Sequence, residues 1–264
     1  MDTAVEIIPG APDAGVVFIC DHASNAVPPD LGGLGLPAAQ FQRHIAYDIG
    51  AADVARALAR VFGAPAVLSR FSRLVIDPNR GADDPTLVMR ISDGAIIPGN
   101  ARADEAEIER RRALYWRPYR EAIAAQVADM LAKGPPPAVI SLHSFTPVWK
   151  GHQRPWETAV LWDLDPRVAA PLMAGLTAAG LSVGDNEPYD GALMGDTLYD
   201  IATQRGLAHA LIEVRQDLIA TSEAADAFAQ ILASALRPVL ARPDTHIVRH
   251  YGSRAAPNTG DRTP

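Results

Sequence analysis

Residues 15–20, GVVFIC, form an apolar run that is followed at once by the polar residues DHASN at positions 21–25. A short apolar run closed by polar residues is typical of a buried strand that ends at the edge of a sheet. Three further runs end in the same way, namely 138–142 before His143, 158–162 before Asp163 and 208–214 before Arg215. Two shorter runs, 66–68 and 74–76, favour an antiparallel hairpin.

Segments with helical periodicity lie between these strands, at residues 49–62, 103–133, 166–179 and 222–240. Pro118 lies inside the second segment, and we expect the helix to kink or break there because proline lacks the backbone N–H. Strands that alternate with helices predict an α/β fold with a mostly parallel sheet, which the hairpin makes mixed. We expect a single domain over residues 1–242. A polar tail over residues 243–264, disordered or loosely packed, would follow it.

Composition excludes several classes of protein. The 264 residues include 24 basic and 31 acidic side chains, a net charge of −7 without a basic stripe, so nucleic acid is not an expected partner. The single Cys20 excludes a disulfide framework and a zinc site built from several cysteines. No apolar run approaches the ~18 residues of a membrane span. The start of the chain lacks the features of a signal peptide, which predicts a cytoplasmic location.

Reactive side chains follow the predicted strands, where parallel sheets form their ligand crevice. His22 and His143 are the best metal ligands there, since neutral imidazole is a common ligand of zinc. The third ligand has two candidates, Asp48 and Asn25. Asp48 lies four residues after His44, on one helical face, but an N-cap role at the following helix is an equal alternative.

Glu213 lies inside an apolar strand, where loss of solvation would raise its pKa toward the range of a general base. The alternative role is an ion pair with a nearby arginine. Arginine side chains at the strand ends are suited to binding a substrate carboxylate or polarising a carbonyl, and they are equally suited to pairing with Asp77 or Asp217. These arginines are Arg73, Arg80 and Arg215.

Five motifs, in order, resemble the N-formylglutamate amidohydrolase family. They are DHASNAVP at 21–28, HIAYDIGA at 44–51, RFSRLVIDPNR at 70–80, SLHSF at 141–145 and IEVRQDLI at 212–219. The resemblance runs from about residue 10 to residue 240. It implies a three-layer α/β/α sandwich around a mixed, mostly parallel sheet, similar to zinc carboxypeptidases and aminoacylases, with a divalent metal such as zinc at the strand ends.

The resemblance also implies roles for individual residues. His22 and His143 would bind the metal, and Asp48 would replace the carboxylate of the peptidase His-x-x-Glu motif, whose last position is Asn25 here. Glu213 would be the general base, and Arg73 would stabilise the oxyanion. The expected substrate-binding residues are Asn79, Arg80, Arg215 and Ser144. The substrate would be a small anion, N-formyl-L-glutamate or a related N-acyl amino acid, hydrolysed to formate and the free amino acid.

Two other functions stay open. The first is an amidase or peptidase with another class of substrate. The second is a catalytically inactive member of the fold that binds a ligand.

Overall fold

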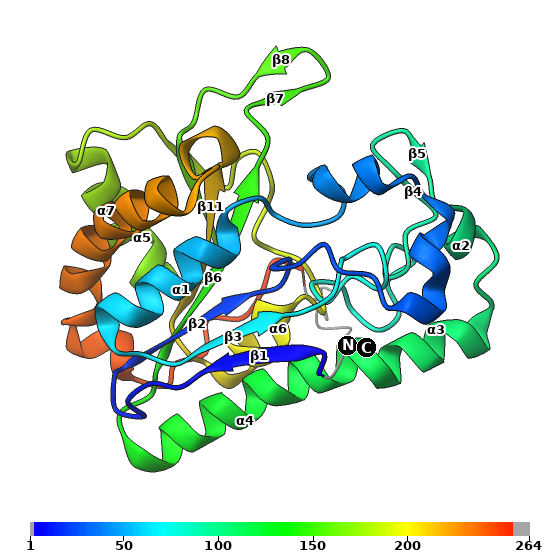
Figure 1. The fold of residues 1–264 in the computed structure, drawn as a ribbon. Coiled ribbons are helices and arrows are strands. Elements are labelled where there is room, and N and C mark those ends of the chain that lie inside the picture. Colours follow the sequence, from blue (N-terminus) through cyan, green and yellow to red (C-terminus); the bar gives the residue numbers. More distant parts are fainter. Residues whose placement is uncertain (1–2, 256–264) are drawn as a thin grey trace, which may run out of the picture.

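The computed structural model describes residues 3–255, which form a seven-stranded mixed sheet (Figure 1). Its strand order is β1-β3-β2-β6-β11-β9-β10. The central strands β3, β2, β6 and β11 are parallel, whereas β1 is antiparallel to β3, and β9 is antiparallel to β11 but parallel to β10. The strands are β1 Val5–Ile8, β2 Val16–Cys20, β3 Ala66–Ser69, β6 Ala138–Phe145, β9 Thr158–Leu161, β10 Val183–Asp185 and β11 His209–Arg215.

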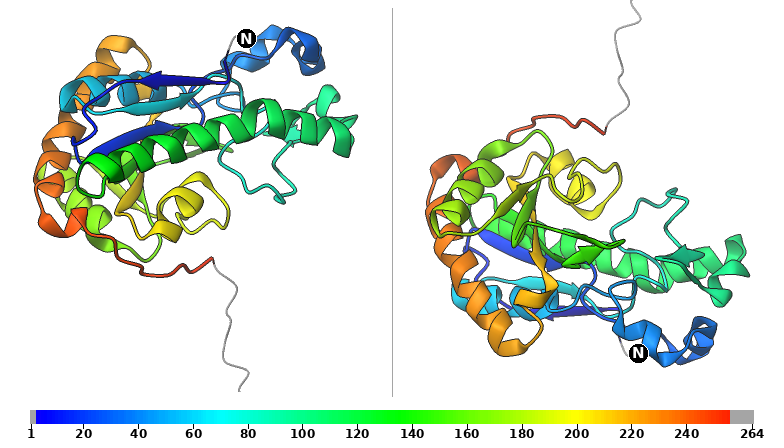
Figure 2. Two further views of the ribbon diagram at one scale, coloured as in Figure 1. Left: turned by 90° about the horizontal axis from the view of Figure 1, so that it is seen from below. Right: turned by 90° about the horizontal axis from the view of Figure 1, so that it is seen from above.

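Helices cover both faces of this sheet, which confirms the predicted sandwich. On one face α1 (Ala51–Phe62), α5 (Pro166–Ala178) and α7 (Ser222–Leu240) pack on alternate strand residues such as Ile140 and Ile212. The two views of Figure 2 show these three helices grouped on one side of the molecule. On the other face α4 (Arg117–Lys133) packs on Val17 and Val139. The period of two along each strand therefore gives the sheet two separate apolar cores.

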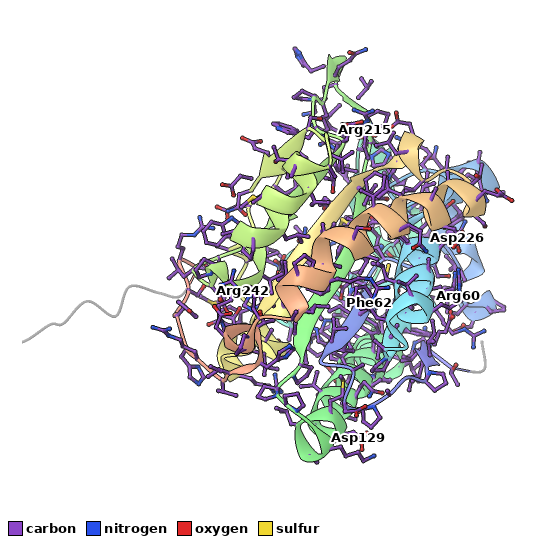
Figure 3. The ribbon with its side chains drawn as sticks, turned by 90° about the vertical axis from the view of Figure 1, so that its left-hand side faces the viewer. Arg60, Phe62, Asp129, Arg215, Asp226 and Arg242 are labelled. Carbon is purple, nitrogen blue, oxygen red and sulfur yellow. The ribbon has the colours of Figure 1, made fainter. Side chains whose placement is uncertain are left out.

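Helices α1 and α7 pack against each other through apolar side chains and are linked at their surface. The Arg60 guanidinium pairs with Asp226 at 2.7 Å, and Arg237 lies 5.2 Å from the Phe62 ring centroid. Figure 3 looks onto this face, with the labelled side chains of Arg60 and Asp226 between the two helices. Helix α1 ends as predicted at Gly63, whose φ of 60° lies in the left-handed region that favours glycine.

The long helix predicted at 103–133 is interrupted before Pro118. Helix α3 (Glu105–Arg111) continues through a π-helical turn at Arg112–Trp116 into α4. Proline has no N–H to give to the preceding turn, and a wider turn places it in the first turn of the next segment, where no such bond is needed. The expected interruption therefore takes the form of a π turn.

The hairpin predicted for 66–68 and 74–76 is wrong. Strand β3 pairs with β1, a strand that was not predicted, and Leu74 and Val75 lie in a buried turn that Ile76 follows. The turn binds side chains in place of a neighbouring strand, since Asn100 donates to the Leu74 carbonyl and Arg111 to the Val75 carbonyl. An apolar run of three residues marks burial here and not a strand.

Short elements extend from the sheet. They are α2 (Pro98–Ala101), α6 (Thr197–Ile201), the hairpin of β4 (Ile91–Ser92) and β5 (Ala95–Ile96), and the hairpin of β7 (Val148–Trp149) and β8 (His152–Gln153). The β7–β8 hairpin projects at the top of Figure 1, and α4 runs below the strands.

The first part of the predicted tail packs on the sheet layers. The Arg167 guanidinium binds the main-chain carbonyls of Asp244 and Gly206, and Arg254 pairs with Asp163 and Asp190. Residues 243–255 are therefore held by hydrogen bonds and ion pairs, and the rest of the predicted tail, 256–264, lies outside the described residues. Among residues 3–255, no helix has the length and apolar character needed to cross a membrane.

Candidate metal centre

His22, Asp48 and His143 meet at the carboxyl ends of two central strands. His22 follows β2, His143 lies near the end of β6, and Asp48 comes from the segment before α1. One nitrogen or oxygen from each residue lies within 4.8 Å of the others, and all three side chains are buried. The Nδ1 of His143 lies 2.8 Å and the Nδ1 of His22 3.4 Å from the same Asp48 Oδ2. The three side chains thus converge on one point.

The loop around Asp48 is held by its backbone. The Asp48 N–H donates to the His22 carbonyl at 2.9 Å, and the Ser144 N–H donates to Asp48 Oδ2 at 3.3 Å. Gly50 has a φ of 80°, and a Cβ there would lie 2.2 Å from the Ile219 carbonyl oxygen, so a side chain at this turn would move the loop. The residue before α1 is Gly50, and Asp48 does not cap the helix.

Asn25, the other candidate for third ligand, faces elsewhere. Its amide nitrogen donates to the Phe41 carbonyl at 2.8 Å, and it does not line the cavity that contains the two histidines. The geometry therefore brings Asp48, and not Asn25, to the pair of histidines. His44 lines the cavity wall, 3.5 Å from Asp93 and 5.9 Å between ring centroids from Trp149, and stands apart from the convergent group.

Each histidine is oriented by a second carboxylate. The Nε2 of His22 donates to Asp77 Oδ1 at 2.7 Å, and the Nε2 of His143 donates to Asp21 Oδ2 at 3.0 Å. These bonds hold a ring proton on Nε2, so each Nδ1 would be free to give its lone pair to a metal at the shared point. A carboxylate behind a histidine is the usual support of a metal-binding imidazole, because it sets the tautomer and raises the basicity of the ring.

The buried charges of this group favour a cation at its centre. Asp21, Asp48 and Asp77 carry three negative charges and Arg73 one positive charge, which leaves two negative charges to be balanced by the two histidines or by a bound cation. Burial alone would raise the pKa of Asp48, but the positive charge of His22 and hydrogen bonds from both histidines hold it below its usual value. Burial lowers the pKa of His143, and its bonds to Asp21 and Asp48 overcome this and raise it. A positive charge is thus favoured at the point where the ligand atoms meet, so the donor set fits a divalent metal.

Glu213 lies beside this group with an unused oxygen. It is paired in register with His143 on the neighbouring parallel strand, so both side chains leave the same face of the sheet. Its Oε2 is buried and has no hydrogen-bond partner among the residues described. Burial raises the pKa of Glu213 to about 7, and the charge of His143 opposes the shift while that of Asp48 adds to it. The alternative role of Glu213, an ion pair with an arginine, is not seen within residues 3–255.

Of the three arginines predicted for the site, two line the cavity and one lies outside it. Arg73 donates to Asp77 Oδ2 at 2.7 Å and lies 3.6 Å from Asp48 Oδ1, so its charge is shared with two carboxylates. Arg80 lines the cavity, binds the Asn79 carbonyl and Thr86, and has no carboxylate partner among the residues described. Arg215 lies outside the cavity lining and pairs with Asp217 at 2.8 Å; its position at the end of β11 is labelled in Figure 3.

Asn79 and Ser144 also line the cavity, with different freedom to bind a ligand. The Asn79 Oδ1 accepts from the Thr197 N–H at 3.1 Å, which fixes the amide and directs its NH₂ group away from that bond. The Ser144 hydroxyl donates to the Ile49 carbonyl at 2.8 Å and accepts from Gln216, so it mainly fixes the loop before α1.

The cavity has a volume of about 460 Å³, within the range of small-molecule sites. Two of its residues, Tyr189 and Asp196, were missed in the sequence because they lie in loops far from any predicted strand end. The Tyr189 hydroxyl accepts from Arg154 at 3.1 Å. Burial and then the charge of Glu213 raise the pKa of Tyr189, so this phenol keeps its proton beside the acidic group.

Asp196 provides a test of electrostatics in the cavity. Burial raises its pKa to about 7, and the bond from the Tyr199 N–H opposes the shift. The folded state therefore holds this proton more tightly than the unfolded state, and the contribution of Asp196 to stability falls as pH rises from about 4 to about 7. Asp196→Asn keeps an acceptor for Tyr199 but cannot ionise.

We expect Asp196→Asn to gain stability relative to wild type by up to about 3 kcal/mol between pH 5 and pH 8. Urea unfolding at the two pH values measures the difference, with the exposed Asp83→Asn as control. Equal stability differences at both pH values would contradict this placement of the proton.

Comparison with known proteins agrees with the motifs. The family model described as N-formylglutamate amidohydrolase matches residues 14–220. A gene product from Agrobacterium tumefaciens of known structure is 37% identical, with a TM-score of 0.84 and coverage of 90% of this chain and 96% of that chain.

The N-formylglutamate amidohydrolase from Ralstonia eutropha is 20% identical, with a TM-score of 0.67 and coverage of 90% of this chain and 97% of that chain, and this likeness shows the fold. No curated protein matches the chain. The matched residues include the strands that hold His22, His143 and Glu213. The chain belongs to the N-formylglutamate amidohydrolase family.

Proposed function

We propose that this protein is a metal-dependent amidohydrolase that cleaves the acyl amide of N-formyl-L-glutamate or a related N-acyl amino acid. The products are formate, or another carboxylate, and the free amino acid. The proposal rests on one observation. The buried His22–Asp48–His143 group, which is surrounded by carboxylates, lines the same cavity as Glu213, whose buried Oε2 has no hydrogen-bond partner among the described residues. Membership of the amidohydrolase family supports the same reaction.

His22, Asp48 and His143 would hold the metal, and zinc suits their nitrogen and carboxylate ligand atoms. When bound, a divalent metal supplies positive charge that acidifies water and polarises an amide carbonyl. Asp21 and Asp77 would keep both rings in the ligating orientation through their bonds to Nε2.

Glu213 would move the protons of the reaction. Its pKa of about 7 allows Oε2 to take a proton from water and to return it to the leaving amine near neutral pH. The surroundings of Glu213 support this role. Its Oε2 has no hydrogen-bond partner among the described residues and is available to a substrate, and the side chain is largely shielded from solvent.

The remaining polar groups suit an anionic substrate. Arg80 and the Asn79 amide offer donors to a carboxylate, and Arg80 makes no ion pair with an acidic side chain among the described residues. The Tyr189 hydroxyl accepts from Arg154 and so is free to donate its proton to the negative oxygen that develops during attack. Arg73 is held between Asp48 and Asp77, and its role would be to fix these carboxylates and add positive charge near that oxygen.

Amide hydrolysis by the purified protein tests the proposal. Zinc-loaded protein would be incubated with N-formyl and N-acetyl amino acids, and both formate or acetate and the free amine would be measured. Release of acid and amine in equal amounts, lost in a Glu213→Gln variant, is the expected result. Absence of hydrolysis across the panel, in protein that holds zinc, would instead favour a member of the fold that binds a ligand without turning it over.

The carboxylate behind His22 gives a separate prediction. Asp77→Asn removes a negative charge and a strong acceptor for Nε2, so we expect zinc affinity to fall by roughly 10–100-fold. Competition with a chromogenic chelator measures the affinity, and Asp83→Asn is the matched surface control. Unchanged affinity would show that His22 needs no orienting carboxylate, or does not bind the metal.

A further inference from the structure

The cavity continues past the proposed catalytic centre along strand β11. Alternate residues of a strand leave the same face, so Glu213, Leu211 and His209 form one row. All three line the cavity, which places its far end about 13 Å from Glu213 along the strand at ~3.3 Å per residue. This depth exceeds what the binding of a formyl group and an α-carboxylate beside Glu213 requires.

Three leucines form the walls of this deeper part. Leu161 is paired with Leu211 on the adjacent strand β9, and Leu198 faces them from α6, which packs against β11. Their exposed fractions are 4% for Leu161 and 7% for each of the other two, and all three line the cavity. The end is closed by His209, whose Nδ1 binds the Leu207 carbonyl and whose Nε2 binds Thr203.

The deeper part of the cavity lacks a positive charge, among the described residues, that could bind a second carboxylate. Arg73 and Arg80 are the arginines among the described lining residues. The charges of both lower the pKa of Asp77, which places them at the metal-binding end of the cavity. Burial lowers the pKa of His209, so its ring is neutral. A glutamate γ-carboxylate in this part would be buried beside leucines and a neutral histidine, without a cation.

We infer that this deep apolar subsite, formed by Leu161, Leu198 and Leu211, selects substrates with one carboxylate and an apolar group the size of a leucine or phenylalanine side chain. The inference rests on the proposed amide hydrolysis and names its substrate class. The apolar group belongs either to the amino-acid side chain or to the acyl chain, because both adjoin the scissile amide. In either case N-formylglutamate is the weaker substrate.

Turnover of a matched panel tests this. We expect kcat/KM for N-formyl-phenylalanine or N-hexanoyl-glycine to exceed that for N-formylglutamate by about tenfold or more, since burial of two methylene groups already contributes about tenfold. The two apolar compounds distinguish the two sources of the group. A preference for N-formylglutamate over both would overturn the inference while the proposed hydrolysis stands.

Substitutions locate the selectivity. Leu198→Phe would fill the subsite and lower the ratio of kcat/KM for N-formyl-phenylalanine to that for N-formylglycine by about tenfold. Leu211→Ala would widen it and favour a bulkier group, which gives a second variant if the first does not fold. Leu114→Phe, at an exposed leucine, is the control and should leave the ratio unchanged. An unchanged ratio in both folded subsite variants would refute the assignment.

Binding gives a readout independent of turnover. Calorimetric titration of the zinc-loaded protein with phenylalanine, hexanoate and glutamate should show binding of an apolar compound that Leu198→Phe weakens and Leu114→Phe does not. This result in a protein that hydrolyses no amide would support the subsite and reject the proposed function. Tighter binding of glutamate would reject the subsite.

Discussion

Replacement of Glu213 by glutamine is expected to lower kcat/KM by about 10³-fold, within the 10²–10⁴-fold range of a general base. Glutamine has nearly the same shape and leaves strand β11 and its pairing with His143 intact. It cannot take a proton from water or return one to the amine. Since Oε2 makes no hydrogen bond in the described structure, the substitution breaks no contact that holds the fold.

Two further measurements distinguish a loss of catalysis from a loss of folded structure. Zinc content and the midpoint of urea unfolding should match wild type or rise, because a buried group that tends to ionise has been replaced by a neutral one. Glu121→Gln, on the exposed face of α4, is the matched control and should keep full activity. Loss of less than about tenfold, with bound zinc retained, would mean that another group moves the proton.

The placement of the histidines and of Glu213 follows from local sequence. Strands β2, β6 and β11 are neighbours in the sheet, and each ends in polar residues, so the side chains near their carboxyl ends meet. The apolar runs that mark these strands are long and fully buried, which makes their positions predictable. The fold class and the location of the possible metal site could therefore be predicted from the sequence.

Other residues depend on contacts that no local pattern contains. Asp21 and Asp77 sit next to predicted strands, but only the three-dimensional structure pairs each with one histidine. Tyr189 and Asp196 reach the cavity from loops more than 100 residues from Asp77 in the chain. Arg215 shows the opposite case: it follows Glu213 by two residues, yet β11 ends there and the side chain pairs with Asp217.

Loss of Asp48 is the second large effect that we expect. Asp48→Ala removes the carboxylate on which both Nδ1 atoms converge and leaves Arg73 with one carboxylate partner, so three contacts of the proposed metal centre disappear together. We expect zinc binding to become undetectable in competition with a chelator. Activity should fall at least as far as in Glu213→Gln.

Asn25→Ala is the decisive comparison, because Asn25 occupies the position of the missing carboxylate in the His-x-x-Glu pattern. Its amide binds the Phe41 carbonyl, away from the histidines, so the variant should bind zinc as wild type does. Zinc per chain and the rise in Tm on zinc addition measure this without an assay. Equal losses in both variants would mean that the loops rearrange around the metal. Zinc retained by Asp48→Ala but lost by Asn25→Ala would transfer the third ligand to Asn25 and leave Asp48 as a partner of Arg73.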